Sequence, residues 1–255
     1  MPASYGRILS YMANGPVLSD SARTYREHTQ RLLSRHSQET AMSLAVGGQF
    51  QSFGVLMRQV LVDAGLRESD YLIDVGCGSG RLSHTLTLQR YLGTDVVPDL
   101  LAYARSICLN PAWRFALVND VSIPEADGAA DMVCFFSVFT HLLHEDSYRY
   151  LREAHRVLKP GGKVVFSFLE FRIHCTWTVF SAMVDARSQD PAKPHNQFIG
   201  RDAIECWASH AGFHIDAFFD GDVPHIAVSE PLTSDEGRVI EGKASFGQSV
   251  CVLSK

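Results

Sequence analysis

Residues 72–82 read LIDVGCGSGRL, and this stretch decides the fold class. An apolar run comes first, glycines at positions 76, 78 and 80 follow, and the segment after them has a pattern that predicts a helix. Glycine adopts backbone angles that other residues avoid, and it lets a ligand approach the main chain where a Cβ atom would block it. A strand, a glycine-rich turn and a helix in this order predict a ligand-binding loop at one edge of a parallel sheet.

The chain on either side of this loop alternates between short apolar runs and helical patterns. Helical segments near 98–108 and 144–158 separate runs typical of buried strands, and this order is typical of parallel βαβ units. Two further strand-like runs, HIDAFFDG at 214–221 and SFGQSVCVL at 245–253, close the pattern. We therefore expect an α/β fold with a doubly wound, mostly parallel sheet of seven strands.

Two parts of the chain lie outside that pattern. Residues 1–50 predict an N-terminal helical cap or lid, and residues 51–255 predict the sheet domain, with insertions at 171–200 and 221–246. Insertions that flank the mouth of a binding site usually build its lid. Ordinary packing of a cap on the sheet is an equal alternative.

Composition excludes several classes of protein. Hydrophobic residues make up 46% of the chain and charged residues 20%, which is typical of a folded globular protein. No apolar run reaches the roughly 18 residues that a membrane span needs, and no charged segment followed by an apolar one begins the chain. The net charge of −5 argues against binding to nucleic acid. We expect a cytoplasmic protein with neither a membrane nor a nucleic acid as partner, and the sequence leaves the oligomeric state open.

Two acids distinguish between possible nucleoside cofactors. Asp95 ends the next strand about 20 residues beyond the first glycine, where a carboxylate can accept hydrogen bonds from both ribose hydroxyls. Asp74, at the start of the loop, would repel a phosphate but suits a ligand with an amino group and a sulfonium charge. Arg81 stands where the dinucleotide fingerprint needs a third glycine. These features favour S-adenosylmethionine over NAD.

The loop, together with GTD at 93–95, NDV at 119–121 and LKPGG at 158–162, resembles the class I S-adenosylmethionine-dependent methyltransferases, which have a Rossmann-like fold. The resemblance implies that the loop holds the methionine part of the cofactor and that Asp120 accepts a hydrogen bond from the adenine amino group. The cofactor-binding residues predicted in this way are Asp74, Gly76, Cys77, Gly78, Arg81, Asp95, Val96, Asp120, Val121, Phe136 and Ser137.

His141 is the candidate general base. It follows the fourth predicted strand, at the edge of the sheet where ligands bind, and histidine has a pKa suited to proton transfer near neutral pH. The alternative is that His141 only packs over the cofactor, because methyl transfer gains most from alignment of the reactants. Glu170 and Arg172 end the fifth strand and are candidates to orient a polar substrate, with surface charge as the alternative. His141 and His144 do not make a metal site, which needs three or four ligands.

The acceptor is expected to be a small molecule that is methylated on oxygen or nitrogen. The reaction is expected to belong to biosynthetic metabolism. Methyltransferases of nucleobase amino groups resemble one another in an Asn/Asp-Pro-Pro-aromatic motif after the fourth strand, whereas residues 135–139 read FFSVF here. Two other functions stay open: an NAD(P)-linked Rossmann oxidoreductase, and an S-adenosylmethionine-binding protein without catalysis.

Overall fold

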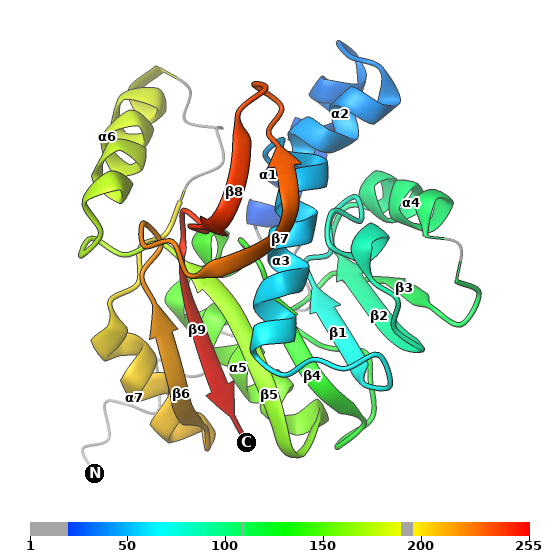
Figure 1. Ribbon diagram of the computed structural model, residues 1–255, viewed down its shortest axis with the longest axis vertical. Coiled ribbons are helices and arrows are strands. Elements are labelled where there is room, and N and C mark those ends of the chain that lie inside the picture. Colours follow the sequence, from blue (N-terminus) through cyan, green and yellow to red (C-terminus); the bar gives the residue numbers. More distant parts are fainter. Residues whose placement is uncertain (1–19, 109, 190–195) are drawn as a thin grey trace, which may run out of the picture.

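The computed structural model describes residues 20–108, 110–189 and 196–255, and their largest sheet has seven strands in the order β3-β2-β1-β4-β5-β9-β6 (Figure 1). Neighbouring strands from β3 to β5 are parallel, and β9 runs antiparallel between β5 and β6. This arrangement confirms the α/β fold with a doubly wound sheet. The strands are β1 (Tyr71–Val75), β2 (Arg90–Asp95), β3 (Arg114–Leu117), β4 (Ala130–Phe135), β5 (Leu158–Phe168), β6 (His214–Phe219) and β9 (Ser249–Ser254).

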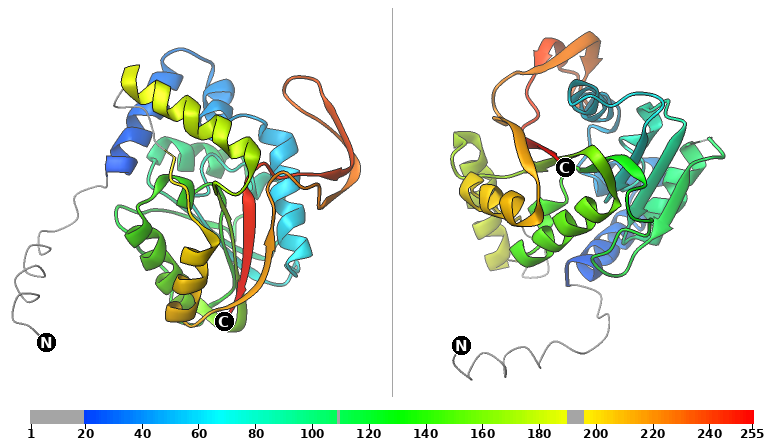
Figure 2. Two further views of the ribbon diagram at one scale, coloured as in Figure 1. Left: turned by 90° about the vertical axis from the view of Figure 1, so that its left-hand side faces the viewer. Right: turned by 90° about the horizontal axis from the view of Figure 1, so that it is seen from below.

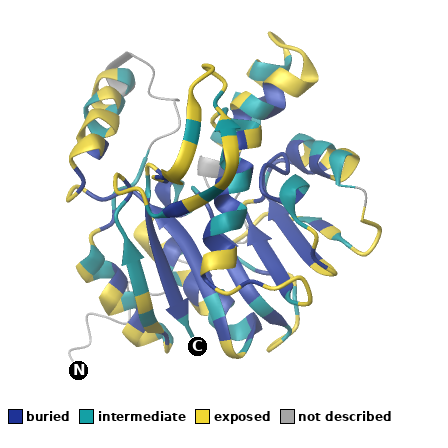
Figure 3. Cartoon of the chain, viewed as in Figure 1, coloured by how far each residue is buried: buried dark blue, intermediate teal, exposed yellow. Residues whose placement is uncertain are grey.

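Helices cover both faces of the sheet. On one face, α3 (Phe50–Asp63) and α4 (Pro98–Ile107) pack into one apolar cluster, and on the other α5 (His144–Val157) and α7 (Arg201–Ala211) pack into a second. Strand β1 contributes to both clusters, because alternate side chains of a strand point to opposite faces. All five of its residues are buried, and Figure 3 shows the same for the central strands. The core is therefore a sheet buried on both sides.

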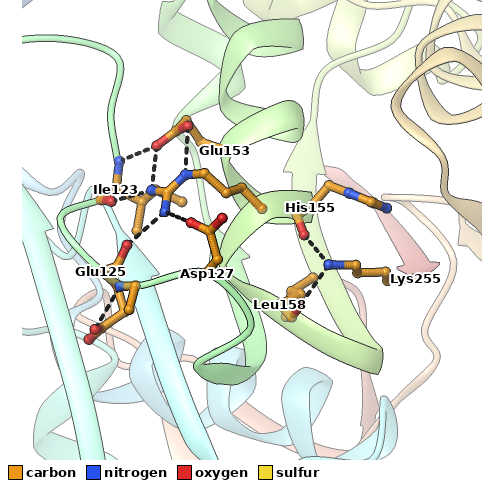
Figure 4. A network of polar contacts seen from close by, with 9 residues as sticks. Ile123, Glu125, Asp127, Glu153, His155, Leu158 and Lys255 are labelled. Atoms are coloured by element: carbon orange, nitrogen blue, oxygen red, sulfur yellow. Dashed lines mark hydrogen bonds and ion pairs between the residues drawn. The ribbon is translucent and has the colours of Figure 1, made fainter.

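The amino-terminal edge of the sheet is held by basic side chains (Figure 4). Arg156 of α5 donates to the carbonyls of Ile123 and Glu125, each at 2.8 Å, and so fixes the loop that leads into β4. Lys255 donates to the carbonyl of His155 at 2.6 Å, which satisfies an acceptor at the end of α5. These contacts tie the helix and the chain end together at the edge opposite the glycine loop.

Four elements gather at the carboxyl edge of the parallel strands (Figures 1 and 2). They are α1 (Asp20–Leu33), α2 (Gln38–Ala45), α6 (His174–Gln189) and a hairpin of β7 (Ile226–Thr233) and β8 (Val239–Ala244). Neither α2 nor this hairpin is predicted from the sequence. The predicted cap at 1–50 is described from residue 20 onward, and its first 19 residues lie outside the described part. No helix in the described part combines the length and apolarity that crossing a bilayer requires.

The prediction of a helix directly after the glycine loop is wrong. The segment forms a single 3₁₀ turn, η2 (Ser83–Thr85), and then runs on without regular structure to β2. The Ser83 and Thr85 hydroxyls donate to carbonyls three residues earlier, which competes with helix formation. Helix α3 lies directly against the loop, because a Cβ atom on Gly54 would come within 2.2 Å of the Arg81 carbonyl oxygen. The loop is therefore supported by α3 rather than by a helix of its own.

Candidate active site

A cavity of about 840 Å3 lies at the carboxyl edge of the sheet, between the glycine loop and the elements that gather above it. Residues of β1, β2 and the segments after β3 and β4 line it from the sheet side, and α1, α2, α3 and α6 line it from the other side. The sequence-predicted residues that line it are Gly76, Cys77, Gly78, Arg81, Asp95, Val96, Phe136, Ser137 and His141.

The glycine loop presents its main chain to the cavity. Gly76 and Gly78 have φ angles of +74° and +57°, which side chains of L-residues disfavour. A Cβ atom at Gly76 would lie 2.5 Å from a methyl group of Val138, and one at Gly78 would lie 2.6 Å from a methyl group of Val46. Both positions therefore require glycine for conformation and for space.

Asp95 shapes this loop as well as facing the cavity. Its two carboxylate oxygens each accept one backbone N–H, from Gly78 at 2.9 Å and from Val97 at 2.9 Å. Burial raises the pKa of Asp95, and the amide donors oppose that rise by stabilising the anion. A carboxylate offers about four acceptor positions in all, so these amides leave part of its capacity for a ligand.

Asp74 is buried beneath the loop and is not among the residues that line the cavity. The Tyr91 hydroxyl donates to it at 2.8 Å and the Cys134 thiol at 3.5 Å. Burial raises the pKa of Asp74 to about 6, against these hydrogen bonds. The structure thus places Asp74 inside the core, where it supports the loop.

Asp120 and Val121 also lie outside the cavity lining. Asp120 is exposed, and its carboxylate accepts the Ser122 hydroxyl at 2.6 Å. The lining beyond β3 comes instead from Val118 and, from α5, Tyr150, neither of which the sequence indicates. Strand β3 ends at Leu117, and the Asp120 carbonyl accepts the hydroxyl of the lining residue Tyr150 at 3.4 Å, so Asp120 lies next to the cavity without lining it.

Arg81 brings a positive charge to the loop end of the cavity. Its side chain is largely buried, and its guanidinium donates to the Gly48 carbonyl at 3.1 Å and lies over the Phe53 ring. Burial lowers the pKa of Arg81 to about 10, and the nearby Asp74 carboxylate opposes this shift. The Nε atom is buried without a hydrogen-bond partner among the described residues. A ligand carboxylate would suit this group.

His141 lies beside helix α1 in the cavity wall. It ends the short 3₁₀ turn η3 (Phe139–His141) that follows β4, and it lines the cavity. Its ring meets the Tyr25 ring edge-on, with 5.1 Å between centroids. His144 faces away, against Trp207 of α7, so the two histidines do not converge.

Comparison with known proteins identifies the domain. Residues 73–166 match the family model described as a methyltransferase domain. The chain carries a class I S-adenosylmethionine-dependent methyltransferase domain. Malonyl-[acyl-carrier protein] O-methyltransferase of Hahella chejuensis is 31% identical over 137 residues, which cover 52% of this chain and 47% of that protein. Ubiquinone biosynthesis O-methyltransferase of Xylella fastidiosa is 27% identical over 157 residues, or 57% of this chain and 61% of that protein. The chain spans about half the length of these relatives.

Solved structures show the same fold. Magnesium protoporphyrin IX methyltransferase of Synechocystis, solved with S-adenosylmethionine bound, is 14% identical with a TM-score of 0.56, over 95% of this chain and 100% of that one. A possible histamine N-methyltransferase of Thermotoga maritima is 16% identical with a TM-score of 0.58, over 93% and 99%. At these identities the likeness establishes the fold alone.

The described residues of the methyltransferase domain fit its cofactor, S-adenosylmethionine. Gly76 and Gly78 line the cavity in a conformation that a side chain would not allow without displacing Val138 and Val46, and the Asp95 carboxylate keeps acceptor capacity for hydroxyl groups. The unpartnered Nε of Arg81 offers a donor to a carboxylate. A Rossmann dinucleotide site would place a helix N-terminus at a pyrophosphate, and here a 3₁₀ turn stands in its place.

The cover of the methyltransferase cavity includes residues that the sequence indicates only indirectly. Tyr25 of α1 lines the cavity, and burial with the nearby charge of Asp95 raises the pKa of its hydroxyl, so that it stays protonated. Tyr25 stands in a polar, arginine-rich segment whose pattern does not indicate that it lines a cavity. Gln248, which precedes β9, also lines the cavity and donates to the Ser137 hydroxyl at 3.0 Å.

The tip of the β7–β8 hairpin does not line the cavity itself, but it binds Gln49, which does. The Gln49 N–H donates to the Asp235 carboxylate at 2.6 Å, and the Gln49 side chain donates to Glu236 at 2.7 Å. Gln49 has a φ of +54° and lines the cavity with Val46 and Gly47. The hairpin tip therefore holds the turn at 46–49 in an unfavourable backbone conformation next to the glycine loop.

Glu170 has a structural role that the sequence does not indicate. It is buried, forms a two-pronged ion pair with Arg201, and accepts the Ser249 hydroxyl at 2.6 Å. It does not line the cavity, and Arg172 is exposed. The interpretation of Glu170 as a substrate-orienting acid is therefore wrong for this geometry.

Proposed function

We propose that this chain transfers the methyl group of S-adenosylmethionine to an oxygen or nitrogen atom of a small-molecule acceptor in biosynthetic metabolism. The observation that carries the proposal is one cavity with the glycine loop and Asp95 on one side and His141 on another. The names of two relatives support a small acceptor group. One is an O-methyltransferase of malonyl-[acyl-carrier protein], and the other is an O-methyltransferase of ubiquinone biosynthesis.

Methyl transfer from S-adenosylmethionine depends more on alignment of the two reactants than on activation of the methyl group. The acceptor atom forms a bond to the methyl carbon while the carbon–sulfur bond breaks, and the leaving sulfur becomes neutral. S-adenosylmethionine supplies an already activated methyl group, so the protein's largest contribution is to hold the two reactants in line and exclude water. An O–H or N–H acceptor must also lose its proton.

The described residues divide these tasks. Asp95 accepts from the ribose hydroxyls, and the main chain at Gly76, Cys77 and Gly78 contacts the methionine part. Arg81 binds the methionine carboxylate, and Phe136 and Ser137 line the same end. Asp74 supports the loop from below. Val96 lies with the ribose, and Asp120 with Val121 would reach the adenine only after a movement of the turn behind β3.

His141 takes the acceptor proton in this proposal. His141→Ala should then lower single-turnover methyl transfer by roughly 10²–10⁴, with little change in S-adenosylhomocysteine affinity. The wild-type rate should rise with pH through the usual range of histidine, near pKa 6.5, and the variant should lack that rise. His144→Ala, on the side facing α7, is the matched control. Overlapping pH profiles would show that alignment alone accounts for the rate.

Titration calorimetry separates the proposed activity from its alternatives. S-adenosylhomocysteine should bind and NAD should not, and methyl transfer to members of an acceptor panel should follow. Binding of NAD without S-adenosylhomocysteine would replace the methyltransferase with an oxidoreductase. Binding of S-adenosylhomocysteine without transfer to any acceptor would favour a cofactor-binding protein without catalysis.

A further inference from the structure

We propose that the acceptor is a small organic acid whose anionic group is held by Arg31 and His28 of α1, while its nucleophilic atom lies at His141. The inference rests on the proposed methyl transfer and adds the class of acceptor. Its basis is the way α1 crosses the cavity and the charge of the residues it brings there.

One stripe of α1 forms a wall of the cavity. Ala22, Tyr25, His28 and Arg31 line it, and because they are three residues apart each successive side chain is turned about 60° further around the helix. Residues from the start, middle and end of α1 therefore face the same space. The helix extends the cavity well beyond the glycine loop.

The other side of α1 makes hydrogen bonds to the part of the sheet that carries Asp95. The Arg26 side chain donates to the Val96 carbonyl at 2.6 Å and to Asn119 at 3.0 Å, and Gln30 donates to Asp99 at 2.8 Å. These contacts anchor α1 over the ends of β2 and β3 and the start of α4. At 100° per residue, His28 points away from Arg26 and Gln30. His28 and Arg31 are thus directed away from the adenosine end.

Helix α6 supplies a further wall through Ala186. Figure 2 shows α6 at the same end of the molecule as α1, above the carboxyl edge of the strands. The part of the cavity between the methionine end of the cofactor site and these two helices is the space for an acceptor. Its apolar lining includes Leu142 and Leu44, which suit the carbon skeleton of a small molecule.

The charge of the cavity is opposite to that of the chain. The chain carries a net charge of −5, whereas the described lining residues include Arg31, Arg81, His28 and His141 and a single carboxylate, Asp95. Both oxygens of that carboxylate already accept backbone amides. Arg81 belongs to the loop end, where it bonds to the carbonyl of Gly48. Arg31 is exposed and lines the cavity, so its cation is accessible to a second ligand.

The spacing along α1 fits a molecule rather than a single ion. Tyr25 meets His141 ring to ring, and Arg31 follows six residues later, roughly 9 Å along the helix axis. An acceptor that places its nucleophile at His141 can thus place a carboxylate near Arg31.

The experiment uses the whole chain, saturated with S-adenosylhomocysteine, and a panel of hydroxy- and amino-substituted aromatic carboxylic acids with their primary amides. Calorimetry should show at least one acid binding tenfold or more tightly than its amide. With S-adenosylmethionine, the same acid should be methylated with the larger kcat/KM. Arg31→Ala should raise KM for that acid by tenfold or more with kcat little changed, and Arg31→Lys should recover part of the loss.

Arg35→Ala is the control, since Arg35 is exposed just beyond α1 and does not line the cavity. Equal binding of acids and amides, or an unchanged KM in Arg31→Ala, would overturn the inference. Failure of S-adenosylhomocysteine to bind would instead overturn the proposed function. Tight binding of an acid without methyl transfer would support the anion site and contradict the transferase.

Discussion

The floor and the cover of the cavity are built in different ways. The floor consists of the glycine loop and Asp95, whose contact through the Gly78 amide joins residues 17 positions apart in the sequence. The cover consists of α1, the turn at 46–49 and the hairpin tip, and its contact between Gln49 and Asp235 spans 186 positions. The floor is mostly buried, whereas the cover combines half-buried residues such as Tyr25 and Gln49 with the exposed Asp235.

This difference separates two properties of the site. Short-range, buried contacts keep the floor in one conformation, because opening it would expose the core of the sheet. The exposed hydrogen bonds between the turn at 46–49 and the hairpin tip can break without unfolding the domain. We therefore expect changes in the floor to alter cofactor affinity and stability together, and changes in the cover to alter ligand exchange with little effect on stability.

The largest effect is expected for Asp95→Ala in the floor. The change removes the acceptor for two ribose hydroxyls, each charge-assisted bond contributing roughly 1.5–3 kcal/mol, so the affinity for S-adenosylhomocysteine should fall tenfold or more. It also leaves the Gly78 and Val97 amides without acceptors, which should lower the free energy of unfolding by about 1–3 kcal/mol each. Calorimetry and urea denaturation measure the two effects.

Asp222→Ala is the control for this change, because Asp222 is exposed and does not line the cavity. An Asp95→Ala variant with the parent's cofactor affinity would refute the ribose assignment. Loss of affinity without loss of stability would refute the view that one carboxylate serves both the ligand and the loop.

The sequence predicts the floor much better than the cover. Glycine spacing and the distance from Gly76 to Asp95 depend on local backbone geometry, and both positions line the cavity. Asp120 does not, because its placement depends on how the chain turns after β3. Tyr25 and Arg31 depend on how α1 docks across the strand ends, which helix periodicity cannot indicate. No sequence pattern in the hairpin or near Gln49 predicts the contact between them.

A second test of the floor uses the pH dependence of stability. Burial raises the pKa of Asp74 in the folded chain to about 6, above its value of about 3.9 in an unfolded chain. The folded state therefore binds the proton more tightly, and the resulting stability is fully present below pH 4 and is lost as pH rises through 6. Two pKa units correspond to about 3 kcal/mol.

Asp74→Asn removes this dependence, because the amide keeps an oxygen to accept from Tyr91 but does not ionise. Relative to the parent, the variant should gain stability between pH 4 and pH 7 in urea denaturation. Asp222→Asn, at an exposed position, provides the comparison. A stability difference between Asp74→Asn and the parent that stays constant over this range would show that Asp74 is not buried as a neutral acid.

The smallest effect is expected for Asp235→Ala in the cover. The variant loses the hydrogen bond to the Gln49 amide, which is exposed and contributes roughly 0.5–1.5 kcal/mol to holding a left-handed residue in place. The turn at 46–49 should then open more often, and S-adenosylhomocysteine should dissociate about two- to tenfold faster. Because no core contact is removed, the free energy of unfolding should change by less than about 0.5 kcal/mol.

Stopped-flow displacement measures the dissociation rate, and hydrogen exchange of the amides at 46–49 reports the opening directly. Glu241→Ala, an exposed change in strand β8 of the same hairpin, controls for effects of lost negative charge. If Asp235→Ala dissociates like the parent while those amides exchange faster, the turn opens without releasing ligand, and α1 alone must retain it. If the free energy of unfolding falls as much as in Asp95→Ala, the hairpin contact unfolds together with the core, because only contacts within the cooperative core contribute stability of that size.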